Sequence, residues 1–311
     1  MLIFQLIARG LAPLTLVASV AAFLYPPAFL VFKDYFLWFF AATMFAIGVV
    51  MEPEELVDTV KRPMRIGLGV LTQYTVMPLF GFAAAMVVMA AGLPKALALG
   101  FIIVGCAPGA MASNVIVYLA GGAVAYSVAL TTVATFLSPL LTPALVEFFG
   151  SVLLPIPFWG IMKTILWVVL VPLIAGLGLR RVLGSSLTAA KQIAPAVAAV
   201  AIIIICAYAV AANQSRIASL GPLVFVLVVV LNALGYVAGG LLARLYRFDR
   251  QHRLTLAIEI GMQNAGLGVA LALKHFESQT ALPGALFAVW CILTAAGASA
   301  YFRRQHAVGA P

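Results

Sequence analysis

The chain has 311 residues, of which 65% are hydrophobic and 9% charged, with a net charge of +9 and a mean hydropathy of +1.16. Soluble domains are about 45–50% apolar and about 25% charged, so this composition excludes a water-soluble globular protein. Its continuous apolar runs, such as residues 201–212, lack the alternation of a transmembrane β-barrel, and we therefore expect an all-α integral membrane protein.

Breaks at Pro, Gly and charged residues divide the chain into ten apolar segments, and a spanning helix needs about 20 residues. In chain order the predicted helices cover residues 10–25, 34–51, 64–91, 95–119, 124–148, 157–179, 190–212, 219–243, 253–273 and 281–302. No small-residue cleavage site follows the first helix, so we expect it to be retained and not removed as a signal peptide. Residues 52–63 are expected to form a short connecting helix.

The basic residues divide unequally between the two ends of this ten-helix arrangement. One end holds 13 of them: Arg9, Lys61, Arg62, Arg65, Arg180, Arg181, Lys191, Arg244, Arg247, Arg250, Arg253, Arg303 and Arg304. The other holds five: Lys33, Lys95, Lys163, Arg216 and Lys274. Because Lys and Arg are retained on the cytoplasmic side, we expect a multi-pass protein of the cell inner membrane with both termini in the cytoplasm. The charge is therefore interpreted as a topology signal and not as nucleic-acid binding.

Five predicted helices precede residue 150 and five follow it. If the halves are structural repeats, an odd number of helices in each gives them opposite topologies, as in many secondary transporters. The sequence therefore predicts two inverted five-helix repeats.

One acidic residue lies in the middle of a predicted membrane-spanning helix. Eight of the nine carboxylates fall at helix ends or in loops, but Glu259 lies inside the ninth predicted helix. A charge there costs at least roughly 2.5–3.5 kcal/mol unless it is paired or hydrated. The interior of the predicted helices, away from their end turns, holds no Lys or Arg, so we expect a mobile cation to neutralise Glu259. The alternative is a protonated, hydrogen-bonded structural Glu.

Oxygen-bearing side chains accompany this acid. Gln263 follows Glu259 by one helical turn, Asn264 comes next, and glycines nearby loosen the backbone. Carboxylate, amide and carbonyl oxygens are hard ligands that suit Na⁺ better than a soft metal. The three Cys and three His are too scattered for a disulfide framework or a metal site.

The fourth predicted helix is also irregular. Pro108 and its neighbouring glycines should break it near residues 107–110, and Asn114 follows the break. Asn114 and Asn264 lie 150 residues apart, at corresponding places in the two halves. Two broken helices that cross near the midplane would direct helix N-termini at an anion and free carbonyls at cations. Ser127 and Thr131, one turn apart, could complete the oxygen shell.

These motifs resemble those of the bile acid:sodium symporter family, in particular its ten-span bacterial members. The segments that carry the resemblance are QYTVMP (73–78), PGAMASN and YLAGG (108–114 and 118–122), LSPLLTP (137–143), LAIEIGMQNAGL (256–267) and ALPGALFAVW (281–290). The resemblance implies a panel domain (residues 1–63 and 151–213) and a core domain (64–150 and 214–304), followed by a cytoplasmic tail (305–311).

The resemblance also implies two Na⁺ sites. The first would use Ser113, Asn114, Ser127, Thr131 and Glu259. The second would use Gln73, Glu259, Gln263 and the backbone carbonyls of Ile260 and Met262.

The sequence departs from the family pattern where substrate is expected. Bacterial relatives tend to carry a small polar residue where Met111 stands, and a His-Asn pair where this chain has Cys291 and Ile292. Asn264 remains as a polar contact, and Ala110 lies beside Met111. Fewer hydrogen-bonding groups should make the pocket more apolar and change its specificity, so bile acid transport itself is not carried over.

We therefore expect a sodium-coupled transporter that imports an organic anion, a bile-acid-like steroid or a small carboxylate, by alternating access. It should be embedded in membrane lipids with no obligatory protein partner. The alternatives are a carrier coupled to protons through Glu259 and, more remotely, an intramembrane transferase. A transferase would need paired carboxylates or a nucleophile with its base, and the sequence offers neither.

Overall fold

The computed structural model of the chain describes residues 11–51, 63–291 and 293–294. The regular elements in this part of the chain are helices, as the composition predicts. In chain order the α-helices are α2 (Leu11–Leu24), α3 (Pro27–Leu30), α4 (Phe36–Val50), α6 (Pro63–Ala90), α7 (Lys95–Gly105), α8 (Ser113–Ala120), α9 (Val124–Gly150), α10 (Phe158–Ile165), α11 (Val171–Val182), α12 (Leu187–Ala211), α13 (Gln214–Leu245), α14 (Arg250–Gly261) and α15 (Ala265–His275). A π-helical turn (Leu166–Leu170) joins α10 to α11, and residues 282–291 are helical.

Within the described residues, five helices are long and apolar enough to cross a membrane: Pro63–Ala90, Val124–Gly150, Phe158–Val182, Leu187–Ala211 and Pro222–Leu245. Large apolar side chains such as Trp167, Phe148 and Leu245 point outward from the bundle. Exposed apolar surface of this kind is tolerated where lipid and not water surrounds it. The helices agree with the predicted segments to within a few residues at most ends, and α3 is an additional short turn.

The two irregular helices are interrupted at the predicted positions. Residues 106–112 separate α7 from α8, which contains the break expected at 107–110, and residues 262–264 separate α14 from α15. Pro78, in α6, lies inside a continuous helix, so proline alone does not break a helix here. The expected connecting helix at 52–63, the N-terminal residues 1–10 and the tail 305–311 lie outside the described residues, apart from Pro63, which begins α6.

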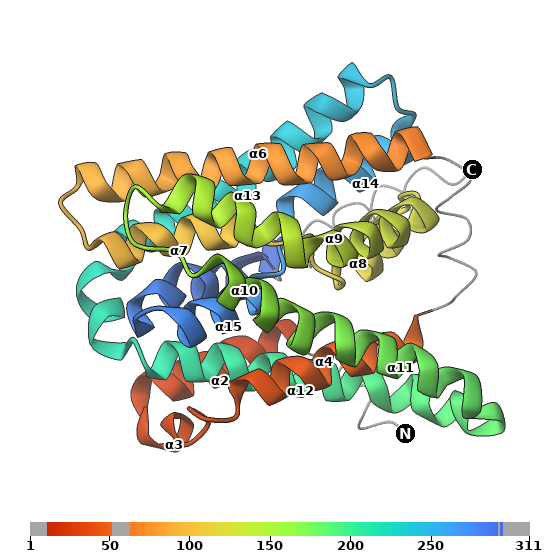
Figure 1. The fold of residues 1–311 in the computed structure, drawn as a ribbon, viewed down its shortest axis with the longest axis horizontal. Helices are drawn as coiled ribbons and strands as arrows, with labels where there is room; N and C mark the ends of the chain where they lie inside the picture. Colours follow the sequence, from red (N-terminus) through yellow and green to blue (C-terminus); the bar gives the residue numbers. More distant parts are fainter. Residues whose placement is uncertain (1–10, 52–62, 292, 295–311) are drawn as a thin grey trace, which may run out of the picture.

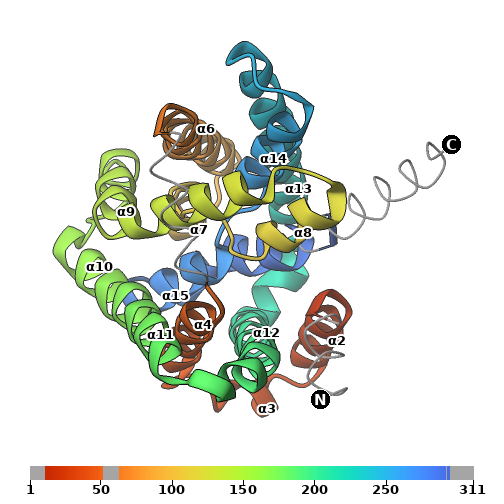
Figure 2. The ribbon, with the colours of Figure 1, turned by 90° about the vertical axis from the view of Figure 1, so that its right-hand side faces the viewer.

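The helices form two layers with the interrupted pair between them (Figures 1 and 2). In one layer α4 packs against α11 and α12, and α12 packs against α2. In the other, α6 packs against α9 and α13. The interrupted helices contact this second layer through α7, which packs against α6, and through α14, which packs against α13. α15 contacts both layers, through α4 and α12 on one side and α7 on the other. This arrangement brings α8, α9 and α14 together at one place.

Candidate functional site

The two interrupted helices cross and bond to each other through their backbones. The N–H of Ala110 donates to the carbonyl of Met262 over 2.9 Å, and the N–H of Asn264 donates to the carbonyl of Pro108 over 2.8 Å. These reciprocal bonds form an antiparallel bridge between Gly109 and Gln263. Backbone groups that leave a helix inside a membrane must find such partners, so each break satisfies the other.

The bridge pairs Gly109 with Gln263 in antiparallel sense, and Asn264 lies opposite Pro108, whose carbonyl accepts its N–H. Asn264 is the N-cap of α15, whereas Asn114 lies inside the first turn of α8. Both asparagines therefore lie near the start of the helix that follows each break.

Glu259 lies at this crossing and is sealed from solvent. Its residue is 1% exposed, and it occupies the last turn of α14. Its Oε1 accepts a hydrogen bond from Ser113 over 2.7 Å and another from Ser127. No Lys or Arg forms an ion pair with Glu259 in the described part of the chain. The structure thus shows a buried acid with no counter-ion among the described residues.

The other two residues of the first predicted ion site, Asn114 and Thr131, join the same cluster. Asn114 Oδ1 lies 2.7 Å from the Ser127 hydroxyl and 3.3 Å from the Thr131 hydroxyl. Ser127 has one proton and two acceptors within reach, so it can satisfy only one of them at a time. Helices α8, α9 and α14 therefore bring carboxylate, amide and hydroxyl oxygens into one cluster.

One carboxylate oxygen of the cluster is left over. Glu259 Oε2 is buried and has no hydrogen-bond partner among the described residues. A Cβ added to Gly109 would come within 3.2 Å of this oxygen and 3.4 Å of Thr131 Cγ2. The lack of a side chain at Gly109 therefore leaves space beside the free oxygen. An unpartnered anionic oxygen among neutral oxygens fits a hard monovalent cation such as Na⁺.

The second predicted set is only partly assembled. Gln73 Nε2 donates to Gln263 Oε1 over 2.7 Å, and Gln263 Nε2 donates to the Ile260 carbonyl over 2.9 Å. The Met262 carbonyl accepts from Ala110 instead. Within the described residues, no hydrogen bond joins the Glu259 carboxylate to either Gln73 or Gln263. The two sets share the crossing, but their polar atoms bond separately.

The residues predicted to contact substrate are dispersed. Asn264 uses its Oδ1 to cap α15, accepting from the Leu267 N–H over 3.1 Å. Ala110 and Met111 lie at the crossing and are half-buried. Cys291 is buried, and Ile292 lies outside the described residues.

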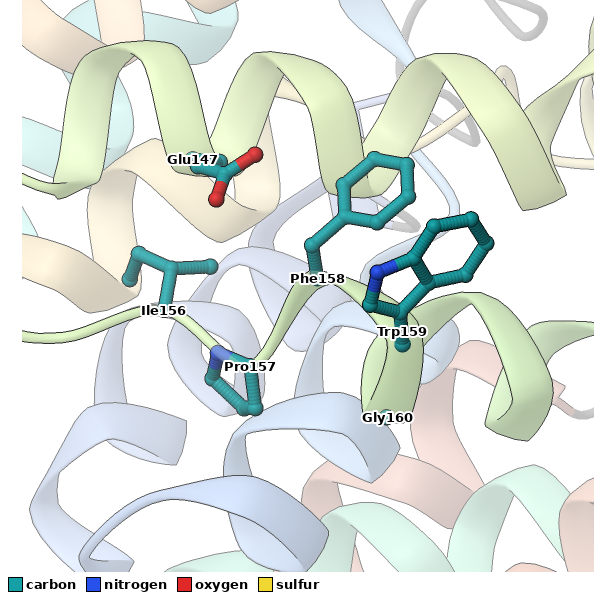
Figure 3. A pocket seen from close by; sticks show the side chains of 6 residues that line it. All are labelled: Glu147, Ile156, Pro157, Phe158, Trp159 and Gly160. Atoms are coloured by element: carbon teal, nitrogen blue, oxygen red, sulfur yellow. The ribbon is translucent and has the colours of Figure 1, made fainter.

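Two cavities lie away from these residues. One, of about 530 Å³, lies between the end of α9 and the start of α10 and is lined by Glu147, Ile156, Pro157, Phe158, Trp159 and Gly160 (Figure 3). The other, of about 250 Å³, is lined by Val229, Asn232, Ala233, Tyr236, Trp290 and Thr294. Neither cavity is lined by a residue of the predicted ion or substrate sets.

Several contacts at the crossing were not predicted. Gln73 Nε2 also donates to the Ala107 carbonyl over 3.2 Å, and Asn232 donates to the Gly261 carbonyl over 2.8 Å at the end of α14. Thr255, one turn before Glu259, accepts from the Ala123 N–H over 2.8 Å. The sequence offered a signal for Thr255, because it is a polar residue on the same helix face as Glu259. It offered no signal for the bonds to the Ala107 and Gly261 carbonyls.

Comparison with known proteins identifies what this arrangement is similar to. A family model described as the sodium bile acid symporter family matches residues 37–220. A sodium-dependent transporter of Bacillus subtilis (strain 168), YocS, is 36% identical over 93% of this chain and 89% of its own length. Probable chloroplastic sodium/metabolite cotransporters of the BASS1 type, from Oryza sativa subsp. japonica and Arabidopsis thaliana, are 36% and 34% identical over 79% of this chain. The matches cover 60% and 61% of these two plant proteins.

Proposed function

The chain belongs to the sodium bile acid symporter family and is a sodium-coupled membrane transporter, and from that premise we propose that it imports an organic anion by alternating access. The family and the relatives are transporters and not enzymes, so the alternative of an intramembrane transferase is wrong.

The observation that carries the proposal is the environment of Glu259. A buried carboxylate with one free oxygen, neutral oxygens around it and no ion pair to a Lys or Arg of the described part of the chain favours binding of Na⁺. We assign Ser113, Asn114, Ser127, Thr131 and Glu259 to this first ion. Because these side chains come from α8, α9 and α14, an ion bound among them would draw the three helices together.

A second Na⁺ is proposed beside the crossing, at Gln73, Glu259, Gln263 and the carbonyls of Ile260 and Met262. The hydrogen bonds that join Gln73, Gln263 and the Ile260 carbonyl support a shared location for these oxygens. Binding there would require Gln263 to exchange its present partners for the ion. This second site should therefore be coupled to the geometry of the crossing itself.

The proposed architecture is ten spanning helices in two inverted five-helix repeats, with residues 1–63 and 151–213, which include α2, α4, α11 and α12, as a panel and residues 64–150 and 214–304 as a core. The two-fold character of the bridge between Gly109 and Gln263 supports the repeat. Coupling needs no direct contact between ion and anion, because it is enough that both bind the same conformation more tightly.

The proposed cargo is a bile-acid-like steroid or a small carboxylate, bound near Ala110, Met111, Asn264, Cys291 and Ile292. The N-termini of α8 and α15 lie at the crossing, where their dipoles favour an anion. The relatives described as sodium/metabolite cotransporters support a cargo class wider than bile acids. We propose a location in the cell inner membrane, with both termini in the cytoplasm.

The test is thermal stability of the purified protein in NaCl and in KCl at equal ionic strength. A ligand that binds only the folded state adds about 2.7 kcal/mol of stability at 100 times its Kd. We expect Na⁺ and not K⁺ to raise the midpoint of the wild type, and Glu259→Gln to lose this response. In proteoliposomes, Glu259→Gln should also lose sodium-driven uptake of organic acids.

Glu147→Gln is the matched control, because Glu147 is an exposed carboxylate far from the crossing, and it should respond to Na⁺ as the wild type does. A full sodium response in Glu259→Gln would exclude this site. Uptake driven by a pH gradient without sodium would instead favour the proton-coupled alternative.

A further inference from the structure

Three of the helices that supply side chains to the two proposed ion sites meet a second time, at one end of the molecule. Helix α6 carries Gln73, α9 carries Ser127 and Thr131, and α14 carries Glu259. The start of α6 and the start of α9 lie beside the connection between α13 and α14 (Figure 1). Their contact there is the Arg65 cluster, defined as Arg65, Tyr126, Phe248, Asp249 and His252.

Asp249 and His252 fix the beginning of α14. Asp249 is the N-cap, and its Oδ1 accepts from the His252 N–H over 3.0 Å. The His252 ring nitrogen Nδ1 lies 2.7 Å from Asp249 Oδ2. Two hydrogen bonds lower the pKa of Asp249 to about 2: the larger effect comes from the His252 backbone N–H and the smaller from the His252 ring. Asp249 is therefore negatively charged at any physiological pH.

The other ring nitrogen of His252 faces a cation from a different helix. His252 Nε2 lies 3.2 Å from Arg65 Nη1, and the same Nη1 lies 3.9 Å from Asp249 Oδ2. A guanidinium only donates hydrogen bonds, so Nε2 must accept and the proton must lie on Nδ1, facing Asp249. The hydrogen-bond network thus assigns a neutral His252. If Nε2 also carried a proton, the Nε2–H and the Arg65 guanidinium would both be donors, and the contact between them would break.

Tyr126 connects this pair to α9. Its hydroxyl donates to the Arg65 carbonyl over 3.2 Å, and its ring centroid lies 5.2 Å from that of His252. Tyr126 directly precedes Ser127, which donates to Glu259. The groups with charge or a titrating proton that face His252 are therefore Arg65 from α6, Tyr126 from α9 and Asp249 at the start of α14.

One face of α14 leads from the cluster to the ion site. His252, Thr255 and Glu259 follow each other at spacings of three and four, which places them on one side of the helix. Thr255 holds this side against the start of α9 through the Ala123 N–H. His252 and Glu259 are seven residues apart, about 10.5 Å along the helix axis. A displacement at one end of so short a rigid segment should reach the other.

We propose that the Arg65 cluster is a positioning clamp for the ion site, and that protonation of His252 releases it and weakens Na⁺ binding. The proposal rests on the sodium site proposed above. With the cluster closed, α14 is held against α6 and α9, and Glu259 stays opposite Ser127. With it open, α14 is free to move from α9, and the oxygens of the site separate.

The experiment measures the Na⁺ concentration for half-maximal thermal stabilisation of the full-length protein at pH 8.0 and pH 5.5. Imidazoles change charge within this range. We expect the wild type to need roughly five- to tenfold more Na⁺ at the lower pH, the lower end of typical coupling between two sites. His252→Gln keeps a polar side chain that does not titrate, so its ratio between the two pH values should fall toward one.

Arg65→Gln is the second variant, should His252→Gln fold poorly. Without the Arg65 guanidinium, a second proton on His252 disrupts no contact with α6, so the ratio of Na⁺ requirements at the two pH values should again fall. Because the clamp is lost, the Na⁺ requirement at pH 8.0 should rise. His275→Gln is the matched control, because this half-buried histidine bonds to Thr164 outside the cluster. It should keep the wild-type pH ratio.

The outcomes separate the two proposals. A wild type that Na⁺ does not stabilise at either pH would overturn the ion site and the clamp with it. A normal sodium response at pH 8.0, with the wild-type pH ratio retained in both His252→Gln and Arg65→Gln, would overturn the clamp alone.

Discussion

At the scale of single residues, the proposed ion site depends on one position that carries no side chain. Gly109 lies beside the free oxygen of Glu259, and an added Cβ would also touch Thr131. The backbone at Gly109 is held by the bridge to Gln263 and has little freedom to withdraw. The space beside the carboxylate is therefore set by the glycine and not by a mobile side chain.

The substitution Gly109→Ala should accordingly weaken sodium binding by roughly tenfold or more, since about 1.4 kcal/mol of crowding corresponds to a factor of ten. Sodium titrations of thermal stability measure this directly. Gly67→Ala is the control, because nothing lies within 4 Å of a Cβ at Gly67. Equal sodium affinity in both variants would mean that the ion does not lie between Gly109 and Glu259.

Residue type identified the acid but not its surroundings. The sequence alone identified Glu259, because a lone carboxylate inside an apolar membrane helix is energetically costly unless it has a functional role. Its hydrogen bonds to Ser113 and Ser127 join residues 146 and 132 positions away, and composition alone does not predict such pairs. The family resemblance supplied those partners, whereas the role of Gly109 required the coordinates.

At the scale of the helices, local chemistry predicted where two of them break. Pro108 lacks an N–H and lies between glycines, so the helix ends there on local grounds. The bridge to Gln263 and the contacts of Arg65 with His252 are tertiary. They depend on how helices far apart in the chain are arranged, which periodicity does not encode. The sequence therefore predicted the breaks and missed both the backbone bridge between them and the Arg65 cluster.

Helix packing also relies on glycine where two backbones meet. A Cβ added to Gly176 in α11 would overlap the Phe45 carbonyl oxygen of α4, and one added to Gly48 in α4 would overlap the Leu173 carbonyl oxygen of α11. Small residues allow such close approach between membrane helices. The pairing of α4 with α11 is therefore fixed from both sides.

Gly176→Ala should destabilise the protein by about 1–3 kcal/mol, the usual cost of overpacking a close contact. The apparent Tm of the purified protein, measured without sodium, should fall. Gly178→Ala in the same helix is the matched control, since nothing lies within 4 Å of a Cβ there and alanine favours the helix. A Tm for Gly176→Ala as high as that of Gly178→Ala would mean that α4 and α11 pack differently.

At the scale of the whole molecule, the connections between helices gather at two opposite ends. The α13 to α14 and α11 to α12 connections lie at one end of the long axis, and α3 and the α6 to α7 connection lie at the other (Figure 1). Among the described residues, most of the Lys and Arg lie at the first end, including Arg65. If basic residues mark the cytoplasmic side, the clamp responds to cytoplasmic pH.

This orientation can be measured with single cysteines, because all three native cysteines are buried and should react slowly. Lys33 and Arg250 are exposed and lie at opposite ends, so Lys33→Cys and Arg250→Cys are matched reporters. In intact spheroplasts, a membrane-impermeant maleimide should label Lys33→Cys and leave Arg250→Cys unlabelled, whereas inside-out vesicles should reverse the pattern. Labelling of Arg250→Cys in spheroplasts would place the Arg65 cluster outside the cell. The clamp would then respond to external pH, on the side from which Na⁺ enters.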